Sequence, residues 1–435
     1  MKKLMMIAAA CSALAASAAI TITDVTARQR WPWNGLVDID FTISGAAAGE
    51  AFAIDIDATA ASGATQLSAK TYATEPVGGS GDNRVVWNLA ADYPEFRAND
   101  LRISVTATPI SDSAAIYMVI DLSGGSSATA WPVRYTLTPP AHVKGASGEP
   151  CQTTELWLRR VCAKGRTFRI NSYDVNNSGV WAQQTNDFYM AIFETTQQQW
   201  YQMTGNWPSK FNNEKYRGSR PLDWFVPNDL LGANWNSPDD REPTETSVLK
   251  KMRDRTGLAT ISLPTEAQWQ YAVAGGPMTS ETTAYGPLAD IARHAANNGG
   301  WTSSGSSATY DFDATVGTAY VGTYEPNSLG LYDMLGNVTE YMLDPFMSYA
   351  NLGNYYKTTL GVGNSSDSPA LEPQGAPHDV AKNQSGYVRT VPLVCFKGAS
   401  FSTAASGVTY FTKSYTGYSD RAIGNGFRLA VTCTK

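Results

Sequence analysis

The stretch LPTEAQWQYAVAGG, residues 263–276, carries the clearest structural signal in the chain. Thr265 and Gln268 have the spacing of a capping box, in which two side chains satisfy backbone N–H groups at the start of a helix. The apolar residues that follow recur at i, i+3 and i+4 and therefore share one helical face: Trp269, Ala272 and Val273. Two glycines then end the pattern. The stretch predicts a short helix with an apolar stripe in the core.

The sequence around this helix, from about residue 155 onward, contains few other regular signals. Long irregular segments rich in Trp, Asn, Gly and Pro separate two further short helices. The first is predicted to begin with Thr195 or Thr196 as N-cap and to stop at Gly205, and the second lies within residues 246–257. The pattern indicates a loop-rich domain over residues 156–435.

Residues 19–140 follow a different pattern, in which apolar and polar residues alternate. LVDIDFTI (36–43) and AFAIDIDA (51–58) are the clearest examples, and Gly, Ser, Asn and Asp separate six or seven such segments. This spacing predicts an all-β sandwich of the immunoglobulin or fibronectin kind. The aspartates of these strands are interpreted as a solvated sheet face, with a calcium or partner site as the alternative.

Two segments are assigned to neither domain. Residues 1–18 combine two lysines, an Ala-rich apolar run and an A-x-A cleavage site, which predicts a bacterial signal peptide and an exported protein: periplasmic, cell-surface or secreted. Acylation of Cys11 as a lipoprotein is the alternative. No later apolar run is long enough to span a membrane. Residues 141–155, rich in Gly, Ser and Pro, are predicted to be the linker.

Composition narrows the function classes. The chain has 435 residues, of which 17% are charged and 43% hydrophobic, so two globular domains are expected. The net charge is −6 and no basic run exists, which argues against nucleic-acid binding. Four cysteines remain after cleavage and allow three disulfide pairings: Cys151, Cys162, Cys395 and Cys433.

Five segments of the C-terminal domain occur in the order and rough spacing of the formylglycine-generating enzyme (sulfatase-modifying factor) family. They are FYMAIFETTQQQW (188–200), LPTEAQWQYAVAGG (263–276), NSLGLYDMLGNVTEY (327–341), KGASF (397–401) and NGFRLA (425–430). The resemblance covers about residues 155–433. It implies an α+β fold related to C-type lectins, with little regular secondary structure. Arg428, in the last segment, is expected to form a buried ion pair or to donate to carbonyl groups.

Members of that family that make formylglycine use two cysteines, five residues apart, to bind copper. Alignment on KGASF places Thr403 and Val408 at these positions, while Ser400 matches a family serine. Neither a hydroxyl nor an aliphatic side chain replaces a thiolate as a Cu(I) ligand. We therefore expect no copper and a catalytically degenerate site.

Other catalytic chemistry finds little support in the residues. The histidines are isolated in the sequence, which argues against the His-ligated iron of other family branches, and they are interpreted as surface or hydrogen-bonding residues: His142, His294 and His378. No G-x-S-x-G motif exists, and nothing selects a pair of carboxylates for glycoside hydrolysis.

Calcium is the metal that the resemblance implies. In the family, the side chain matching Asp333 and the carbonyls matching Met334, Gly336 and Val338 hold the ion, and a glycine turn can direct several oxygens inward. A glycine turn with a capping Asp333 is the alternative. A weaker second site combines one of two asparagines with one of two aspartates: Asn297 or Asn298, and Asp311 or Asp313.

The sequence thus predicts an exported, degenerate family member that binds a protein, peptide or glycan. An active family enzyme with a site other than the cysteine pair and a structural surface or matrix protein remain the alternatives. The insertion at residues 345–392 is expected to be a flexible loop.

Overall fold

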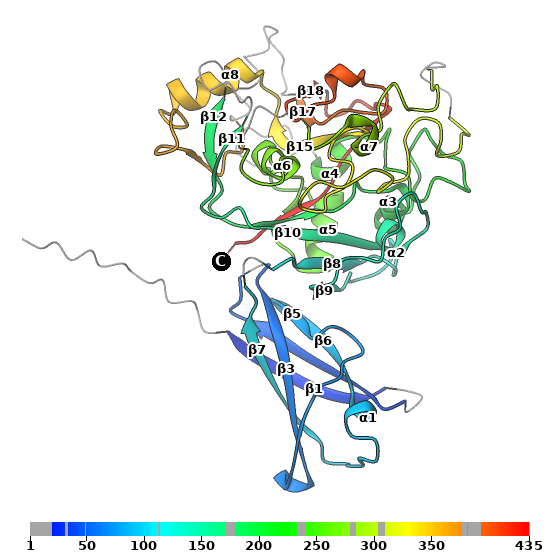
Figure 1. The fold of residues 1–435 in the computed structure, drawn as a ribbon, viewed down its shortest axis with the longest axis vertical. Coiled ribbons are helices and arrows are strands. Elements are labelled where there is room, and N and C mark those ends of the chain that lie inside the picture. Colours follow the sequence, from blue (N-terminus) through cyan, green and yellow to red (C-terminus); the bar gives the residue numbers. More distant parts are fainter. Residues whose placement is uncertain are drawn as a thin grey trace, which may run out of the picture.

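The computed structural model describes residues 20–434 except 31–33, 48, 112–113, 171–178, 233–240, 279–283, 303–308, 376–380 and 382–392. The predicted signal peptide, Cys11 and His378 therefore lie outside the described residues. The described chain is mostly β, with strands more numerous than helices. Figure 1 shows a narrow N-terminal lobe of strands attached to a larger C-terminal lobe.

Two antiparallel sheets form the N-terminal lobe. One has the order β1 (Thr21–Gln29), β2 (Leu36–Ser44), β6 (Gly81–Asn88). In the other, β3 (Ala51–Ala60) pairs with β4 (Thr65–Ser68), β5 (Val77–Gly79) and β7 (Arg102–Pro109). Apolar residues of both sheets share one core, which includes Ile39, Phe41, Ile54, Ile56 and Trp87. The predicted alternation of residues 36–43 and 51–58 is confirmed, because their apolar positions are the buried ones.

One aspartate of this region does not lie on a solvated face. Asp38 is buried and accepts hydrogen bonds from the guanidinium of Arg30 at 2.9 and 2.6 Å. A buried carboxylate needs such a partner because burial removes its hydration. The prediction of outward aspartates was therefore wrong for Asp38, since alternation does not reveal what covers a strand.

Two strands assigned by their alternation to the N-terminal domain belong to the main sheet of the C-terminal lobe. β8 (Tyr117–Asp121) pairs with β9 (Val133–Thr136) and with β10 (Glu155–Val161). The first four residues of β8 are all buried, as in a strand covered on both faces. The change of sheet therefore falls between β7 and β8, upstream of the predicted linker.

The main sheet of the C-terminal lobe has six strands in the order β14-β20-β13-β10-β8-β9. Its further strands are β13 (Phe188–Ala191), β14 (Ile261–Ser262) and β20 (Ala430–Thr432). One smaller sheet holds β11 (Thr167–Ile170), β12 (Val180–Gln183) and β16 (Ala370–Leu371). The other has the order β18 (Lys413–Thr416), β17 (Val394–Lys397), β15 (Thr339–Pro345), β19 (Asn425–Gly426).

The helices are short. They are α1 (Leu89–Asp92), α2 (Pro150–Thr153), α3 (Gln197–Thr204), α4 (Asn228–Leu231), α5 (Val248–Thr256), α6 (Glu266–Val273), α7 (Leu288–Ile291) and α8 (Tyr349–Asn354). Thr196 is the N-cap of α3, and Thr265 with Gln268 forms the predicted capping box of α6. No helix in the described parts of the chain is long and apolar enough to cross a membrane.

One prediction about this lobe is confirmed and extended, and another needs correction. The apolar stripe of α6 is buried as predicted, and so is every other residue of the helix, because the helix contacts both β11 and β15. The predicted loop at residues 345–392 contains α8 and β16, and α8 is capped by the hydroxyl of Ser348. Residues 376–380 and 382–392 lie outside the described residues.

The predicted linker is packed against the C-terminal lobe. Within it, α2 follows Glu149, and the buried side chain of Gln152 donates a hydrogen bond of 2.9 Å to the carbonyl of Val321. Polar groups of the segment are thus satisfied by the lobe.

The sequence allows three disulfide pairings without selecting one, and none of the three is formed in the structure, where Cys151, Cys395 and Cys433 are free thiols.

Candidate functional site

The turn after β17 contains the residues at the two cysteine positions of the family. The hydroxyl of Thr403 accepts a hydrogen bond of 3.0 Å from the N–H of Ser400, and the hydroxyls of Ser400 and Ser402 lie 3.0 Å apart. Val408 is 2% exposed and packs in the core. The structure therefore offers one hydroxyl within a closed turn and one buried aliphatic side chain, with no pair of metal-binding donors at these two positions.

His294 lies next to this turn. The N–H of Ala295 donates to the carbonyl of Thr403 at 2.9 Å, and Nδ1 of His294 accepts from the N–H of Ala296 at 3.3 Å. Burial, followed by the charge of Arg293, lowers the pKa of His294. The imidazole is therefore a neutral, hydrogen-bonding group, as the sequence predicted for this residue.

An aromatic cluster borders the same turn. The ring centroid of Phe401 lies 5.3 Å from that of Phe211 and 4.9 Å from that of Trp301. Tyr310 stacks on Phe211 with a centroid distance of 5.2 Å. The indole N–H of Trp301 and the hydroxyl of Tyr310 are buried without a hydrogen-bond partner. These residues are far apart in the sequence, so the high aromatic count was the only available signal for this cluster.

The predicted calcium residues lie on one buried turn. Asp333 is 1% exposed, and its Oδ2 accepts a hydrogen bond of 2.7 Å from the N–H of Gly322, while its Oδ1 is buried without a partner. Met334 and Val338 are each 1% exposed, and Gly336 takes a positive φ of 85°. A Cβ at Gly336 would lie 2.3 Å from the carbonyl oxygen of Arg293, so the turn requires glycine.

Buried carboxylates surround this turn in excess of buried cations. Glu194 accepts from the N–H of Val338 at 2.9 Å, and Glu340 pairs with the guanidinium of Arg428 through two contacts of 2.7 Å. Burial, with the charges of Asp333 and Glu340, raises the pKa of Glu194 well above its usual value. Arg428 also donates to two carbonyl oxygens, which confirms the expected role of this residue. The unpartnered Oδ1 and the surplus of negative charge fit a bound cation.

An arginine occupies the region of the weaker calcium prediction. The guanidinium of Arg293 donates to the carbonyls of Asn297, Thr315 and Gly317. Among the described residues, no hydrogen bond joins Asn297 to the exposed Asp311. The two residues are therefore not brought together.

The neighbouring alternatives are also engaged in local hydrogen bonds. The side-chain oxygen of Asn298 accepts from the N–H of Trp301 at 3.1 Å, and that of Asp313 accepts from the N–H of Thr315 at 2.9 Å. The guanidinium of Arg293 satisfies the carbonyl oxygens here much as a metal ion would.

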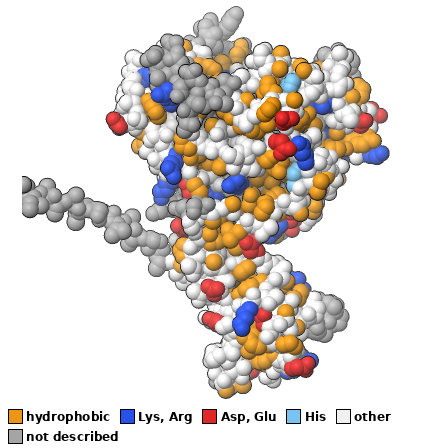
Figure 2. Space-filling view, viewed as in Figure 1, with side chains coloured by type: hydrophobic (Ala, Val, Ile, Leu, Met, Phe, Trp, Pro, Cys, Tyr) orange, Lys and Arg blue, Asp and Glu red, His pale blue; other side chains and the backbone are white. Residues whose placement is uncertain are grey.

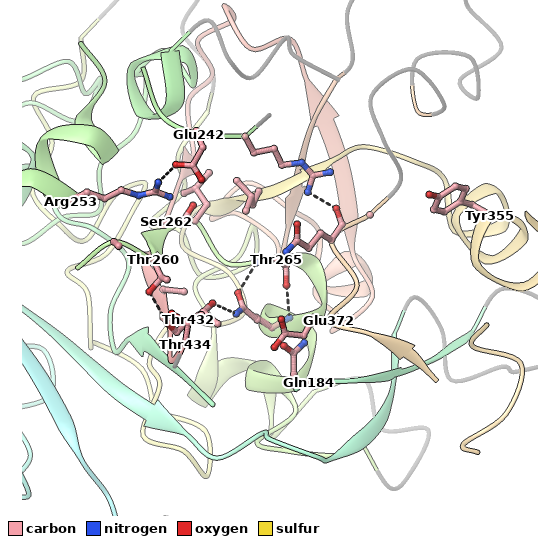
Figure 3. A pocket seen from close by; sticks show the side chains of 18 residues that line it. Gln184, Glu242, Arg253, Thr260, Ser262, Thr265, Tyr355, Glu372, Thr432 and Thr434 are labelled. Carbon is pink, nitrogen blue, oxygen red and sulfur yellow. Dashed lines mark hydrogen bonds and ion pairs between the residues drawn. The ribbon is translucent and has the colours of Figure 1, made fainter. Parts of the chain in front are cut away.

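A polar cavity of about 660 Å³ lies between β14, β20, the start of α6 and the segment around β16. Figure 3 shows hydroxyl and amide side chains around it: Gln184, Thr260, Ser262, Thr265, Thr432 and Thr434. Gln268 also lines it. The Nε2 of Gln184 and the Oγ of Ser262 are buried without a partner. Sequence reasoning missed this site, because its residues come from distant segments.

The charged groups at the cavity already have hydrogen-bond or ion-pair partners. Arg253 pairs with Glu242, Arg241 donates to the carbonyl of Gln374 at 2.6 Å, and Glu372 accepts from the amide of Asn186 at 2.7 Å. The cavity is therefore polar without a dominant charge. Figure 2 likewise shows positive and negative side chains interspersed on the visible face.

The C-terminal lobe is similar in sequence to a known domain family and to several known proteins. The sulfatase-modifying factor enzyme 1-like domain matches residues 160–433. The chaperone protein LppX of Paenibacillus barcinonensis is 27% identical over 201 residues, which cover 42% of this chain and 69% of that protein. The formylglycine-generating enzyme of Thermomonospora curvata is 29% identical, with 41% and 62% covered, and that of Mus musculus is 26% identical, with 44% and 52% covered.

Two solved structures are also similar. Treponema denticola variable protein 1 aligns with a TM-score of 0.42 and 20% identity over 64% of this chain and 95% of that one. PvdO from Pseudomonas aeruginosa aligns with a TM-score of 0.41 and 16% identity over 68% and 100%.

Proposed function

The chain belongs to the sulfatase-modifying factor enzyme 1-like domain family, and from this premise we propose that it is an exported member that no longer makes formylglycine and binds a short neutral glycan. The observation that carries the loss of catalysis is the turn at residues 400–408. Thr403 uses its hydroxyl to close the turn and Val408 is buried in the core, so the two positions supply no thiolate for copper.

The polar cavity supports binding of a glycan. A buried polar atom without a partner costs about 1–3 kcal/mol, so a folded protein rarely keeps two in one cavity. The Nε2 of Gln184 and the Oγ of Ser262 are such atoms, and both side chains line the cavity, one from just after β12 and the other from β14 (Figure 3). These two atoms are themselves covered, but their side chains line the cavity among other hydroxyls and amides, and a sugar hydroxyl, which both donates and accepts, matches such a lining.

The remaining lining agrees with a neutral ligand. Hydroxyls and amides dominate it, the arginines and glutamates are already engaged, and Tyr355 adds an aromatic ring. The volume of about 660 Å³ lies within the range of about 300–1,000 Å³ that is typical of ligand pockets. Arg253 and Glu242 neutralise each other, and the remaining charged lining residues, Arg241 and Glu372, are of opposite sign, so the lining carries no net charge and suits a neutral ligand.

The proposal includes the architecture and a structural ion. The N-terminal sheets would form an immunoglobulin- or fibronectin-like sandwich, and the C-terminal lobe would be related to C-type lectins. The buried turn at Asp333 would hold calcium through the unpartnered Oδ1, with the carbonyls of Met334, Gly336 and Val338 as the further ligands that the family resemblance implies. When bound, the ion would neutralise buried negative charge and add stability.

Binding is tested with three neutral trisaccharides, maltotriose, cellotriose and chitotriose, titrated into the mature chain by calorimetry. We expect one of them to bind, and Gln184→Leu or Ser262→Ala to weaken it about fivefold or more, since each removes about 1 kcal/mol of hydrogen bonding. Gln66→Leu, an exposed glutamine in β4, is the matched control. Failure of all three sugars, or equal weakening by Gln66→Leu, would contradict the assignment.

Loss of catalysis is tested separately. The chain is incubated with a sulfatase-type cysteine peptide, copper and oxygen, and the peptide is measured by mass spectrometry. We expect unchanged cysteine, and conversion to formylglycine would overturn the reading of Thr403 and Val408.

A further inference from the structure

Three side chains with metal-binding atoms converge in the segment that packs against the C-terminal lobe. Nδ1 of His142 lies 2.5 Å from Oε2 of Glu149, and the sulfur of Cys151 lies 3.9 Å from the same oxygen. One ligand atom from each residue lies within 4.8 Å of the others. The side chains of His142 and Glu149 are 4% and 16% exposed, and Cys151 is buried. Partial exposure of Glu149 gives an ion a path from solvent.

The surroundings fix which nitrogen of His142 faces the cluster. Its Nε2 lies 3.0 Å from the carbonyl oxygen of Gly322, an acceptor, so Nε2 carries a proton. The ring is held between Phe193 and Tyr332, at centroid distances of 5.0 and 5.2 Å. A backbone carbonyl that orients the far nitrogen is the usual arrangement around a metal-binding histidine.

The contact between Nδ1 and the carboxylate then requires a positive species. With Nε2 protonated, the neutral ring presents a lone pair at Nδ1 to the lone pairs of Glu149, and two acceptors at 2.5 Å repel. Either a second proton or a metal ion removes this repulsion. A proton would serve His142 and Glu149 alone, whereas a metal ion would also use the sulfur of Cys151.

We propose that His142, Glu149 and Cys151 form a zinc site with a single equivalent of metal per chain. An imidazole, a carboxylate and a thiolate are a donor set that zinc accepts and that calcium and magnesium, which prefer oxygen ligands, do not. All three ligands come from residues 142–151, so little chain entropy is lost in gathering them. The ion fastens this segment to the C-terminal lobe through Gly322. This site is separate from the glycan cavity and does not depend on it.

The test uses the full mature chain after treatment with a chelator. Zinc is titrated by calorimetry, and cobalt is added as a probe, since cobalt bound to a thiolate shows a charge-transfer absorption band. We expect one equivalent of each metal. Cys151→Ser should abolish the band, and His142→Gln should lower the zinc affinity more than about 100-fold, because even the loss of a ligand's partner costs about 10–100-fold.

Cys433→Ser is the matched control, because this partly exposed thiol lies outside the cluster and its variant should keep the band. If the cluster variants do not fold, X-ray absorption of the zinc-loaded natural chain decides the matter. One sulfur with nitrogen and oxygen ligands supports the site. Three results would each overturn the proposed zinc site. They are the absence of stoichiometric zinc binding, a zinc coordination shell without sulfur, and loss of the cobalt absorption band in Cys433→Ser but not in Cys151→Ser.

Discussion

Glu266 is the residue whose neutralisation should damage the C-terminal lobe most clearly. Its carboxylate is 3% exposed and lies 3.3 Å from the ammonium of Lys397 and 2.9 Å from that of Lys413. These side chains are 0% and 3% exposed. The change Glu266→Gln keeps the shape and one acceptor oxygen but leaves two buried ammonium groups without their shared counter-charge.

The expected cost follows from this burial. Removal of one partner from a buried ion pair costs about 3–5 kcal/mol. Because two lysines lose the same carboxylate, we expect about 4–5 kcal/mol for Glu266→Gln. At about 2–4 °C per kcal/mol for a lobe of this size, the melting temperature should fall by about 8–20 °C.

The effect should also depend on pH. Burial raises the pKa of Glu266, but Lys413 and Lys397 outweigh burial, so the pKa lies below its usual value. The stabilising contribution is therefore present above the unfolded pKa of about 4.3 and is lost as the pH falls through the folded pKa. The difference between the natural chain and Glu266→Gln should shrink below about pH 4.

Unfolding in urea, followed by tryptophan fluorescence, measures both effects. Glu325→Gln is the matched control, since its pair with Lys144 is about half exposed on both sides and should contribute less than about 1 kcal/mol. The double variant Glu266→Gln/Lys413→Met should recover part of the loss, because it removes one unpaired ammonium. An equal loss of the free energy of unfolding in Glu266→Gln and Glu325→Gln would refute the assigned role of the buried Glu266 carboxylate.

Three further predictions concern glycine, calcium and pH. Gly322→Ala should lower the melting temperature more than Gly257→Ala. Both glycines have positive φ, but only at Gly322 would a Cβ lie 2.3 Å from another atom, the Nε2 of His142. At Gly257, where the space is open, the change should cost about 1–2 kcal/mol. Calcium added to chelator-treated protein should raise the melting temperature, equivalent to about 2.7 kcal/mol at 100 times Kd, and Asp333→Ala should remove the rise; an unchanged melting temperature in the natural chain would count against the site. Burial raises the pKa of Asp344 and of Asp223 to about 6. As the pH falls from 7, the folded state therefore takes up these two protons before the unfolded state does. The free energy of unfolding should rise by about 3 kcal/mol for each group as the pH falls from 7 to about 4. Asp344→Asn should flatten that profile in urea titrations, and an unaltered profile would contradict the assignment.

Gly322 connects the two proposed metal sites. Its N–H donates to Asp333 at 2.7 Å and its carbonyl accepts from His142 at 3.0 Å. One residue thus orients, through its N–H and its carbonyl, the carboxylate of the proposed calcium site and the imidazole of the proposed zinc site. Loss of either ion should therefore be felt at the other site as a change in affinity.

Local signals in the sequence were sufficient for the parts of the fold that depend on neighbours along the chain. Thr196 caps α3, and Thr265 with Gln268 caps α6, because a capping box needs only residues three positions apart. The five family segments indicated the domain over about residues 155–433 for the same reason, since each is a short contiguous motif, and the family match covers residues 160–433. They also located Thr403 and Val408, and with them the absence of the thiol pair.

Tertiary structure alone decided what the local patterns left open. Alternation shows that a strand has a buried face but not which sheet buries it. The structure therefore shows β8 and β9 in the main sheet of the C-terminal lobe, and Asp38 buried in an ion pair with Arg30. The polar cavity joins Gln184 to Ser262, and the aromatic cluster joins Phe211 to Phe401, across long stretches of chain. No spacing rule connects such residues, because their proximity is set by the packing of sheets and loops and not by the period of a helix or strand.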